Sequence, residues 1–282
     1  MKIRAKTVVR RDGFALVMAL MAFAVLSSIA TAVMVATRNA ARATNSDVSV
    51  LHARHLADAG LMRLIASAED PTDELLQQLR SSTQPVQWTY ADGIIALSIF
   101  PESGKIDVNA GDPELLRCAL RAAVQDSRRV EEMTQSIFLA RERNRPFATL
   151  LALLSPRERL LPVASRLRSM FTVMTHSKGI NPGSASAEVL RCLPGITDRR
   201  MEILRAAQRG DASLEVAPEH SSYAALFEPE QPIYTLLAVA NAPDGTVAIR
   251  QATITVDPYS RRASIVVWDD LVESREFPGD TS

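Results

Sequence analysis

The residues best suited to chemistry are four histidines and two cysteines, and their spacing points away from an enzyme. His52, His55 and Asp58 recur at intervals of three, so they would share one face of a helix. Zinc needs further ligands that nothing nearby supplies, so we expect a solvated polar face, with a metal site as the weaker alternative. His176 and His220 belong to no HExxH or Ser/His/Asp arrangement. The sequence therefore predicts no catalytic residue and no cofactor.

The two cysteines lie at matching positions of an internal repeat. IDVNAGDPELLRC (106–118) and INPGSASAEVLRC (180–192) align at an offset of 74 residues and share isoleucine, glutamate, leucine, arginine and cysteine. Each copy predicts an extended isoleucine, a small-residue turn and a helix capped by Asp112 or Ser186. Two cysteines are too few for a disulfide scaffold or a zinc cluster. Cys118 and Cys192 either form one disulfide, if the domain is exported, or each pack as a small apolar residue.

The second copy continues into the tight turn Pro194-Gly195-Ile196, which resembles the helix-hairpin-helix pattern. Consecutive backbone N–H groups of such a turn can hold a phosphate. The pattern usually has a second glycine where this chain has Thr197, and a β-branched residue resists the close backbone approach. The arginines that could supply charge are Arg191, Arg199, Arg200 and Arg205. Because 32 basic and 32 acidic residues cancel over the chain, we expect a packing motif, with DNA binding as the alternative.

A basic head precedes a long apolar run at the amino terminus. No charged residue occurs between Gly13 and Thr37. As a helix, this run would extend about 37 Å, enough to cross a hydrocarbon core of about 30 Å. Cations before the run keep that end in the cytoplasm, so we expect a single-pass protein whose remaining chain lies outside it. These cations are Lys2, Arg4, Lys6, Arg10 and Arg11.

Three interpretations of this junction are open. A plain anchor would stay uncut, and a secretory signal peptide would be cut at Ala30-Thr31-Ala32. The residues after that site are still apolar, which disfavours the second interpretation. We favour a cut between Gly13 and Phe14, because it leaves the whole apolar helix on the mature protein. A short basic leader, a glycine, a phenylalanine and an uninterrupted apolar helix resemble the prepilin leader of type IV pilins and type II secretion pseudopilins.

This resemblance implies roles for three residues. A prepilin peptidase would cleave after Gly13, and the new amine of Phe14 would be methylated. Most pilin-like subunits carry glutamate at the fifth mature position, which is Met18 here. A carboxylate in a membrane persists only with a partner, which in these fibres is thought to be the amino terminus of the subunit above. A subunit without the carboxylate needs no subunit above it, so Met18 suggests the tip of a fibre.

The rest of the chain predicts an α+β fold. Helical spacing continues to Pro71, with Ala57, Leu61, Leu64 and Ile65 on one face. Strand-like runs occupy 93–101, 233–240, 246–256 and 262–268, and the last three form an antiparallel meander that the helix can cover. We expect a pilin-like long amino-terminal helix packed on a small antiparallel sheet, with a large all-helical insertion containing helix-hairpin-helix-like repeats. The predicted parts are the leader 1–13, the transmembrane half 14–37, the α/β domain 38–104 with 231–270, the insertion 105–230 and a flexible tail 271–282.

Together these features resemble the protein K family of the type II secretion system, the large minor pseudopilins. KIDVNAGDPELL (105–116) and INPGSASAEVLRCLPGI (180–196) carry the resemblance. It implies a minor pseudopilin at the tip of the pseudopilus, which initiates or caps assembly and supports export of folded proteins across the outer membrane. The implied location is the bacterial inner membrane, with the globular domain in the periplasm. A membrane-anchored DNA-uptake protein and a type IV pilus minor pilin are the alternatives.

The resemblance also implies partners and a metal. The partners would be other minor pseudopilins, the major pseudopilin, the prepilin peptidase and, at the tip, an exported protein or the secretin. Nucleic acid is not an expected partner. Some family members bind calcium, but no segment has the spacing of a calcium loop. The acidic residues that we consider for calcium are Asp107, Asp257, Asp269 and Asp270.

Overall fold

A computed structural model of the chain describes residues 12–82, 84–160, 162–209 and 226–269. The chain divides into two compact units, residues 1–52 and 53–282. Helix α1 (Asp12–Glu69) contributes to both and ends just before Asp70-Pro71, because proline cannot continue a helix. Most of the predicted leader and the predicted tail 271–282 lie outside the described residues.

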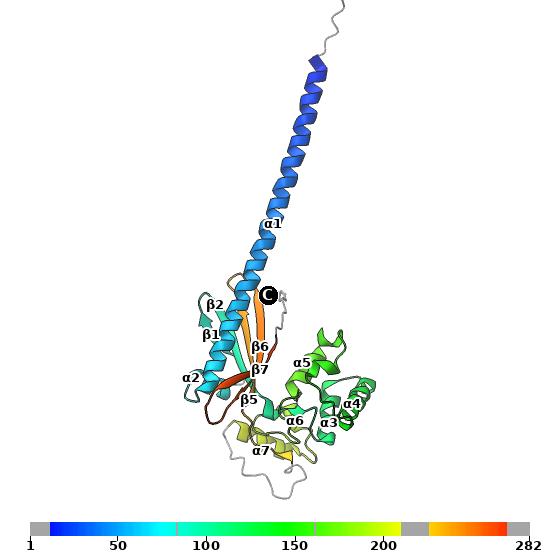
Figure 1. Ribbon diagram of the computed structural model, residues 1–282, viewed down its shortest axis with the longest axis vertical. Helices are drawn as coiled ribbons and strands as arrows, with labels where there is room; N and C mark the ends of the chain where they lie inside the picture. Colours follow the sequence, from blue (N-terminus) through cyan, green and yellow to red (C-terminus); the bar gives the residue numbers. More distant parts are fainter. Residues whose placement is uncertain (1–11, 83, 161, 210–225, 270–282) are drawn as a thin grey trace, which may run out of the picture. The chain divides into compact units, whose positions relative to one another are not determined.

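The second unit contains a five-stranded antiparallel sheet with the strand order β1-β2-β5-β6-β7. Its strands are β1 (Val86–Tyr90), β2 (Gly93–Pro101), β5 (Ile233–Asn241), β6 (Val247–Val256) and β7 (Ala263–Asp269). All four predicted strands are present, whereas β1 and the short helix α2 (Glu74–Ser81) were not predicted. The carboxy-terminal part of α1 crosses one face of the sheet (Figure 1).

This helix packs closely on the sheet, and we call the shared apolar interior the sheet core. A Cβ atom at Gly60 would lie 2.8 Å from Cγ2 of Ile95, so only glycine allows the observed approach of the helix. At the same interface Arg250 Nε donates to Asp58 Oδ1 at 2.8 Å. The predicted core positions of α1 are buried or partly buried here. Side chains in the sheet core include Ala57, Leu61, Leu64, Ile65, Leu97, Leu236 and Ile254.

A large insertion connects β2 to β5 (green and yellow in Figure 1). Its helices are α3 (Pro113–Ala123), α4 (Ser127–Glu142), α5 (Pro162–Met170), α6 (Ala187–Leu190) and α7 (Asp198–Gln208). Short 3-10 helices of the insertion include η1 (Glu102–Gly104), η2 (Leu150–Leu153) and η3 (Glu158–Leu160). The apolar interior formed between residues 106 and 204, which includes Leu115, Leu116, Met133, Ile137 and Phe171, is called the insertion core below.

The expectation of an all-helical insertion needs correction. β3 (Ile106–Asp107) and β4 (Phe171–Thr172) form a two-stranded parallel sheet. Ile180 and Phe227 form a further parallel bridge. Each of these pairings involves only one or two residues whose partners are distant in the chain, so neither produces a periodic pattern that the sequence could reveal.

Candidate functional site

The amino-terminal part of α1 presents an apolar surface. Leu16, Met18 and Phe23 have 64%, 55% and 75% of their surfaces exposed. The most apolar window of this helix has a mean hydropathy of 2.3, and none of that window is buried. A helix that is hydrophobic all round requires an apolar environment, either lipid or other helices. This helix is long and apolar enough to cross a membrane.

Three threonine hydroxyl groups of this helix find partners within the helix itself. Thr31, Thr37 and Thr44 each donate to the carbonyl oxygen four residues earlier, at distances between 2.8 and 3.0 Å. A hydroxyl without a partner is costly in lipid, so this local bonding suits an apolar environment. Small side chains along one side, including Ala24, Ser28 and Ala32, line a shallow hollow. Small residues of this kind allow a second helix to approach closely.

The residues of the predicted leader junction lie at the beginning of α1. Gly13 and Phe14 are in its first turn, where the backbone alone is described, and Met18 is in the second turn. The helix is continuous from Asp12 across the predicted cleavage bond into the apolar run. Cleavage after Gly13, methylation of Phe14 and the tip role of Met18 stay predictions.

The two copies of the internal repeat begin with the same geometry. Ile106 pairs with Phe171, and Ile180 pairs with Phe227, each in a parallel arrangement. Both isoleucines are completely buried in the insertion core. The two copies are therefore alike also in this pairing, whose partner residues Phe171 and Phe227 lie outside the aligned sequence segments.

The residue after each isoleucine closes a turn with its own side chain. Asn181 Oδ1 accepts the backbone N–H of Gly183 at 2.7 Å. Asp107 Oδ1 accepts the N–H groups of Asn109 and Ala110 at 2.7 and 2.9 Å. The second carboxylate oxygen of Asp107 accepts a hydroxyl and a backbone N–H from the loop after β4, at 3.3 and 2.9 Å. Asp107 is fully buried, and its carboxylate links the turn after β3, in the first copy, to the loop after β4 by hydrogen bonds.

Both predicted helix caps are present, and a disulfide joins the two copies. Asp112 accepts two N–H groups in the first turn of α3, at 2.9 and 3.2 Å, and Ser186 accepts one in α6 at 3.3 Å. Cys118 and Cys192 are bonded through their sulfur atoms, with their Cα atoms 5.4 Å apart. The cross-link therefore connects equivalent positions, which is the first of the two arrangements that the sequence left open.

In the hairpin turn Pro194-Gly195-Ile196 and the first turn of α7, backbone N–H groups bond within the chain. Gly195 has a φ of 70°, a conformation that favours glycine, and Ile196 N–H donates to the carbonyl of Leu193 at 3.2 Å. Thr197 caps α7, with its Oγ1 accepting the N–H of Arg200 at 3.4 Å. This hydroxyl uses one of the N–H groups that a bound phosphate would need. The arginines Arg199, Arg200 and Arg205 share α7 with Asp198 and Glu202, which offset most of their charge.

The acidic and histidine residues considered for metals, apart from Asp270, lie in the part of the chain that the structure describes. Among the residues that the structure describes, no group of three or more His, Cys, Asp or Glu side chains could hold an ion. Asp58 pairs with Arg250, and Asp107 has four donors around it. Asp257 accepts two N–H groups and a hydroxyl of its own turn. Asp269 ends β7, and Asp270 lies outside the described residues.

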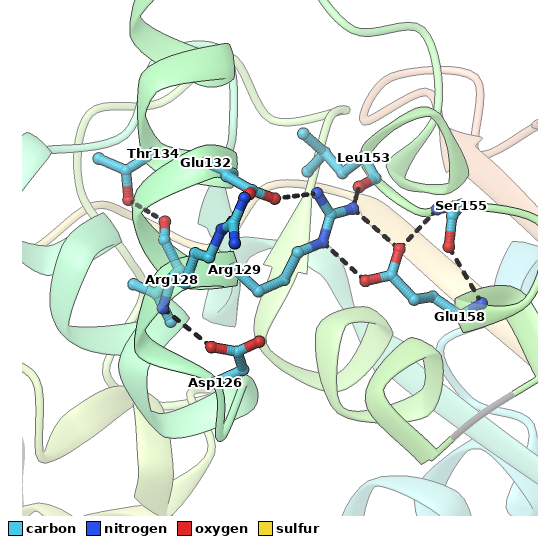
Figure 2. Close-up of polar contacts among 9 residues, drawn as sticks. Asp126, Arg128, Arg129, Glu132, Thr134, Leu153, Ser155 and Glu158 are labelled. Atoms are coloured by element: carbon cyan, nitrogen blue, oxygen red, sulfur yellow. Dashed lines mark hydrogen bonds and ion pairs between the residues drawn. The ribbon is translucent and has the colours of Figure 1, made fainter.

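An ion-pair cluster that the sequence did not reveal fastens the loop carrying η2 and η3 to α4 (Figure 2). Arg129 donates to both carboxylate oxygens of Glu158 at 2.6 and 2.8 Å, and to the carbonyl of Leu153 at 2.9 Å. Ser155 N–H donates to Glu158 at 2.6 Å. The Arg129 guanidinium, followed by Ser155, lowers the pKa of Glu158 from its ordinary 4.5 to about 2. We call this group the Arg129–Glu158 clamp.

Comparison with known proteins identifies a related fold. No protein-family model matches the chain. No curated protein sequence matches it. One solved structure that does match is a chain of the crystal structure of the GspK-GspI-GspJ complex from the type 2 secretion system of enterotoxigenic Escherichia coli. The two chains are 14% identical, with a TM-score of 0.52, and the match covers 81% of this chain and 98% of that one.

The fold is pilin-like. The predicted fold class is thereby confirmed in its main features, a long amino-terminal helix and an antiparallel sheet. At 14% identity the likeness shows the fold alone. Among the described residues, the most prominent features are the exposed apolar helix and the disulfide-linked insertion.

Proposed function

We propose that this chain is a minor pseudopilin of a type II secretion system, anchored in the bacterial inner membrane by α1 with the rest of the chain in the periplasm. One observation carries the proposal. The chain joins an exposed apolar helix to a helix-covered antiparallel sheet with a large insertion, and it resembles nearly the full length of a chain in the GspK-GspI-GspJ complex. The disulfide supports an oxidising location.

The proposed role is structural. The small-residue side of α1 would pack against the corresponding helices of other minor pseudopilins and of the major pseudopilin. The absence of a carboxylate at Met18 supports a place at the tip, where no further subunit has to be engaged. There the protein would initiate or cap the pseudopilus and meet the exported protein or the secretin. Calcium binding stays an expectation from the family resemblance, without a site among the described residues.

Processing of the amino terminus tests the anchor. The full chain is expressed with and without a prepilin peptidase, extracted from membranes and sequenced from its amino terminus. We expect the peptidase to produce a chain that starts at methylated Phe14, and we expect the Gly13→Leu variant to stay uncut. An unchanged wild-type chain would support a plain anchor, and a chain starting near Val33 would support a secretory signal peptide.

The position in the fibre is tested by labelling. Pseudopili assembled with the other subunits of the same system are stained with gold-labelled antibody against the insertion. Label at one end of each fibre is expected, whereas label along the whole fibre would contradict the tip assignment. A salt-dependent titration of the protein with duplex DNA covers the alternative, because micromolar binding that weakens steeply with salt would favour a DNA-uptake protein.

A further inference from the structure

The sheet has a second face that α1 does not cover. Strand side chains alternate between faces, so the neighbours of core residues such as Leu97, Leu236 and Ala252 point the other way. The register places Ser98, Leu237 and Gln251 side by side on this face. Phe100, at the end of β2, is 45% exposed.

A groove runs between this face and the insertion. A hollow of about 520 Å³ has the apolar side chains of Phe100, Leu237 and Ile249 on one wall. Its other wall is formed by serine residues of α5 and of the loop before α6, namely Ser165, Ser169, Ser184 and Ser186. A smaller hollow of about 90 Å³ continues it, since Lys105, Arg168, Thr235 and Gln251 line both. We call the two hollows together the sheet–insertion groove.

The charged residues that line the larger hollow are both basic. Lys105 and Arg168 line the larger hollow, and its described lining contains no Asp or Glu. Lys105 already pairs with the buried carboxylate of Glu102, which also accepts the hydroxyl of Thr235 at 2.7 Å. Arg168 is a partly buried residue, and its guanidinium has no ion pair or hydrogen bond with the residues that the structure describes. A partly desolvated cation without a partner favours an incoming anion.

The two walls together indicate what kind of molecule fits. The hydroxyls of Ser169, Ser184 and Ser186 already bond within the chain. Pure hydrocarbon would leave the side chains of Ser165, Gln251 and Arg168 without polar partners among the described residues, which is unfavourable. An extended peptide offers backbone N–H and C=O groups to these unpaired polar side chains and apolar side chains to the sheet wall. The volume of the larger hollow is in the range of sites for ligands of a few residues.

We propose that the sheet–insertion groove binds an extended peptide segment of a partner protein, with apolar side chains against Phe100, Leu237 and Ile249 and a carboxylate paired with Arg168. The unpaired guanidinium of Arg168 and the absence of Asp and Glu from the described lining of the larger hollow select the carboxylate. The apolar side chains of the sheet wall, together with the unpaired polar groups of Ser165 and Gln251, select the peptide. The inference is independent of the proposed function, because it rests on the second unit alone.

The test uses the full chain in phospholipid nanodiscs and a set of fluorescent peptides. The probe is the acetylated, amidated peptide Thr-Leu-Thr-Val-Glu-Val-Thr, with versions that carry Gln or Lys in place of Glu. Fluorescence anisotropy measures the Kd of each peptide for the wild-type protein and for Arg168→Gln and Arg168→Glu. The matched control is Arg166→Gln, because Arg166 is exposed on the same helix and does not line the groove.

We expect saturable binding of the Glu peptide and roughly tenfold weaker binding of the Gln peptide, because an ionic hydrogen bond is lost. Arg168→Gln should bind the Glu and Gln peptides equally weakly, and Arg166→Gln should behave as wild type. Arg168→Glu should prefer the Lys peptide, which also shows that the variant is folded.

Three results would overturn the proposal. These are no saturable binding of the Glu peptide, equal effects of the Arg168→Gln and Arg166→Gln substitutions, and displacement of the peptide by oleate at lower concentration than by unlabelled peptide. The last result would assign the groove to a hydrocarbon ligand.

Discussion

The sheet core and the insertion core both bury apolar side chains, but they differ in how the chain forms them and in what stabilises them. The sheet core joins α1 to strands more than 150 residues away, and small residues such as Gly60, Ala238 and Ala252 let the backbones approach closely. The insertion core is built mainly from one continuous stretch of chain with larger side chains, including Met133 and Phe171. A disulfide, a buried carboxylate and the Arg129–Glu158 clamp reinforce it. The two cores share no residue, so each should respond to its own substitutions.

The largest expected effect comes from the disulfide. Replacing Cys118 and Cys192 together by serine removes a cross-link between positions 74 residues apart. In the chain-entropy description, a loop of this length is worth about 4 kcal/mol. Hydrogen exchange should then speed up in α3 and α6, while amides of β5 and β6 keep their protection. Equal loss of protection in both regions would show that the two cores unfold as one.

Removing the buried carboxylate should be the next most damaging change. Asp107→Ala leaves four donors without their acceptor, so we expect a loss of about 3 kcal/mol, measured by urea denaturation. Asn181→Ala is the matched control in the second copy, because its side chain accepts one N–H group in the described structure. It should cost about 1 kcal/mol. If the two variants were equally stable, the four hydrogen bonds of Asp107 would not stabilise the first copy more than the single bond described for the Asn181 side chain stabilises the second.

On the sheet side, Gly60→Leu tests the dependence on close approach. A larger side chain would meet Ile95, Ala238 and Leu97, the nearest of which is 2.8 Å from the position of a Cβ atom. Overpacking of this kind costs about 2 kcal/mol, and exchange should speed up in β2 and β5 and not in α3. His55→Leu, on the exposed side of the same helix, should leave the free energy of unfolding nearly unchanged. Faster exchange in α3 would contradict the separation of the cores.

The contrast between the cores also explains what the sequence could predict. Strands β2, β5, β6 and β7 and the core positions of α1 follow local periodicity, so they were found. Strand β1 was missed because it is only five residues long and because its hairpin turn begins with Ala91, at a φ of 52°, in place of the usual glycine or asparagine. The pairing of β3 with β4 is too short and too distant in the chain to leave a pattern.

The residues of the candidate site also divide into those that local sequence predicts and those that depend on contacts distant in the chain. The caps Asp112 and Ser186 follow from local rules, and their bonds are present. Whether Cys118 meets Cys192 depends on the distance between their Cα atoms, which sequence spacing does not determine. Glu158, the closest ion-pair partner of Arg129, is likewise 29 residues away. Arg168 is distinguished only by having no ion pair or hydrogen bond in the described structure. Such features require the folded chain.

The smallest expected effect concerns the clamp and depends on pH. Glu158→Gln removes an ion pair whose partners are 27% and 21% exposed, so we expect a loss of about 1–2 kcal/mol at pH 7. Because folding lowers the pKa of Glu158 from 4.5 to about 2, its contribution is complete above pH 4.5 and is lost as the pH falls toward 2. The unfolding free energies of wild type and variant should therefore converge over this range.

Glu132→Gln is the matched control for the clamp. Glu132 also meets Arg129, at 3.3 Å, but it is 48% exposed, and such pairs contribute less than about 0.5 kcal/mol. If Glu158→Gln were no more damaging than Glu132→Gln, or if its effect were the same at pH 3 and pH 7, the clamp would not stabilise the insertion. Of the three reinforcing features of the insertion core, only the disulfide and Asp107 would then contribute to its stability. The contacts of Arg129 would not distinguish it from the sheet core.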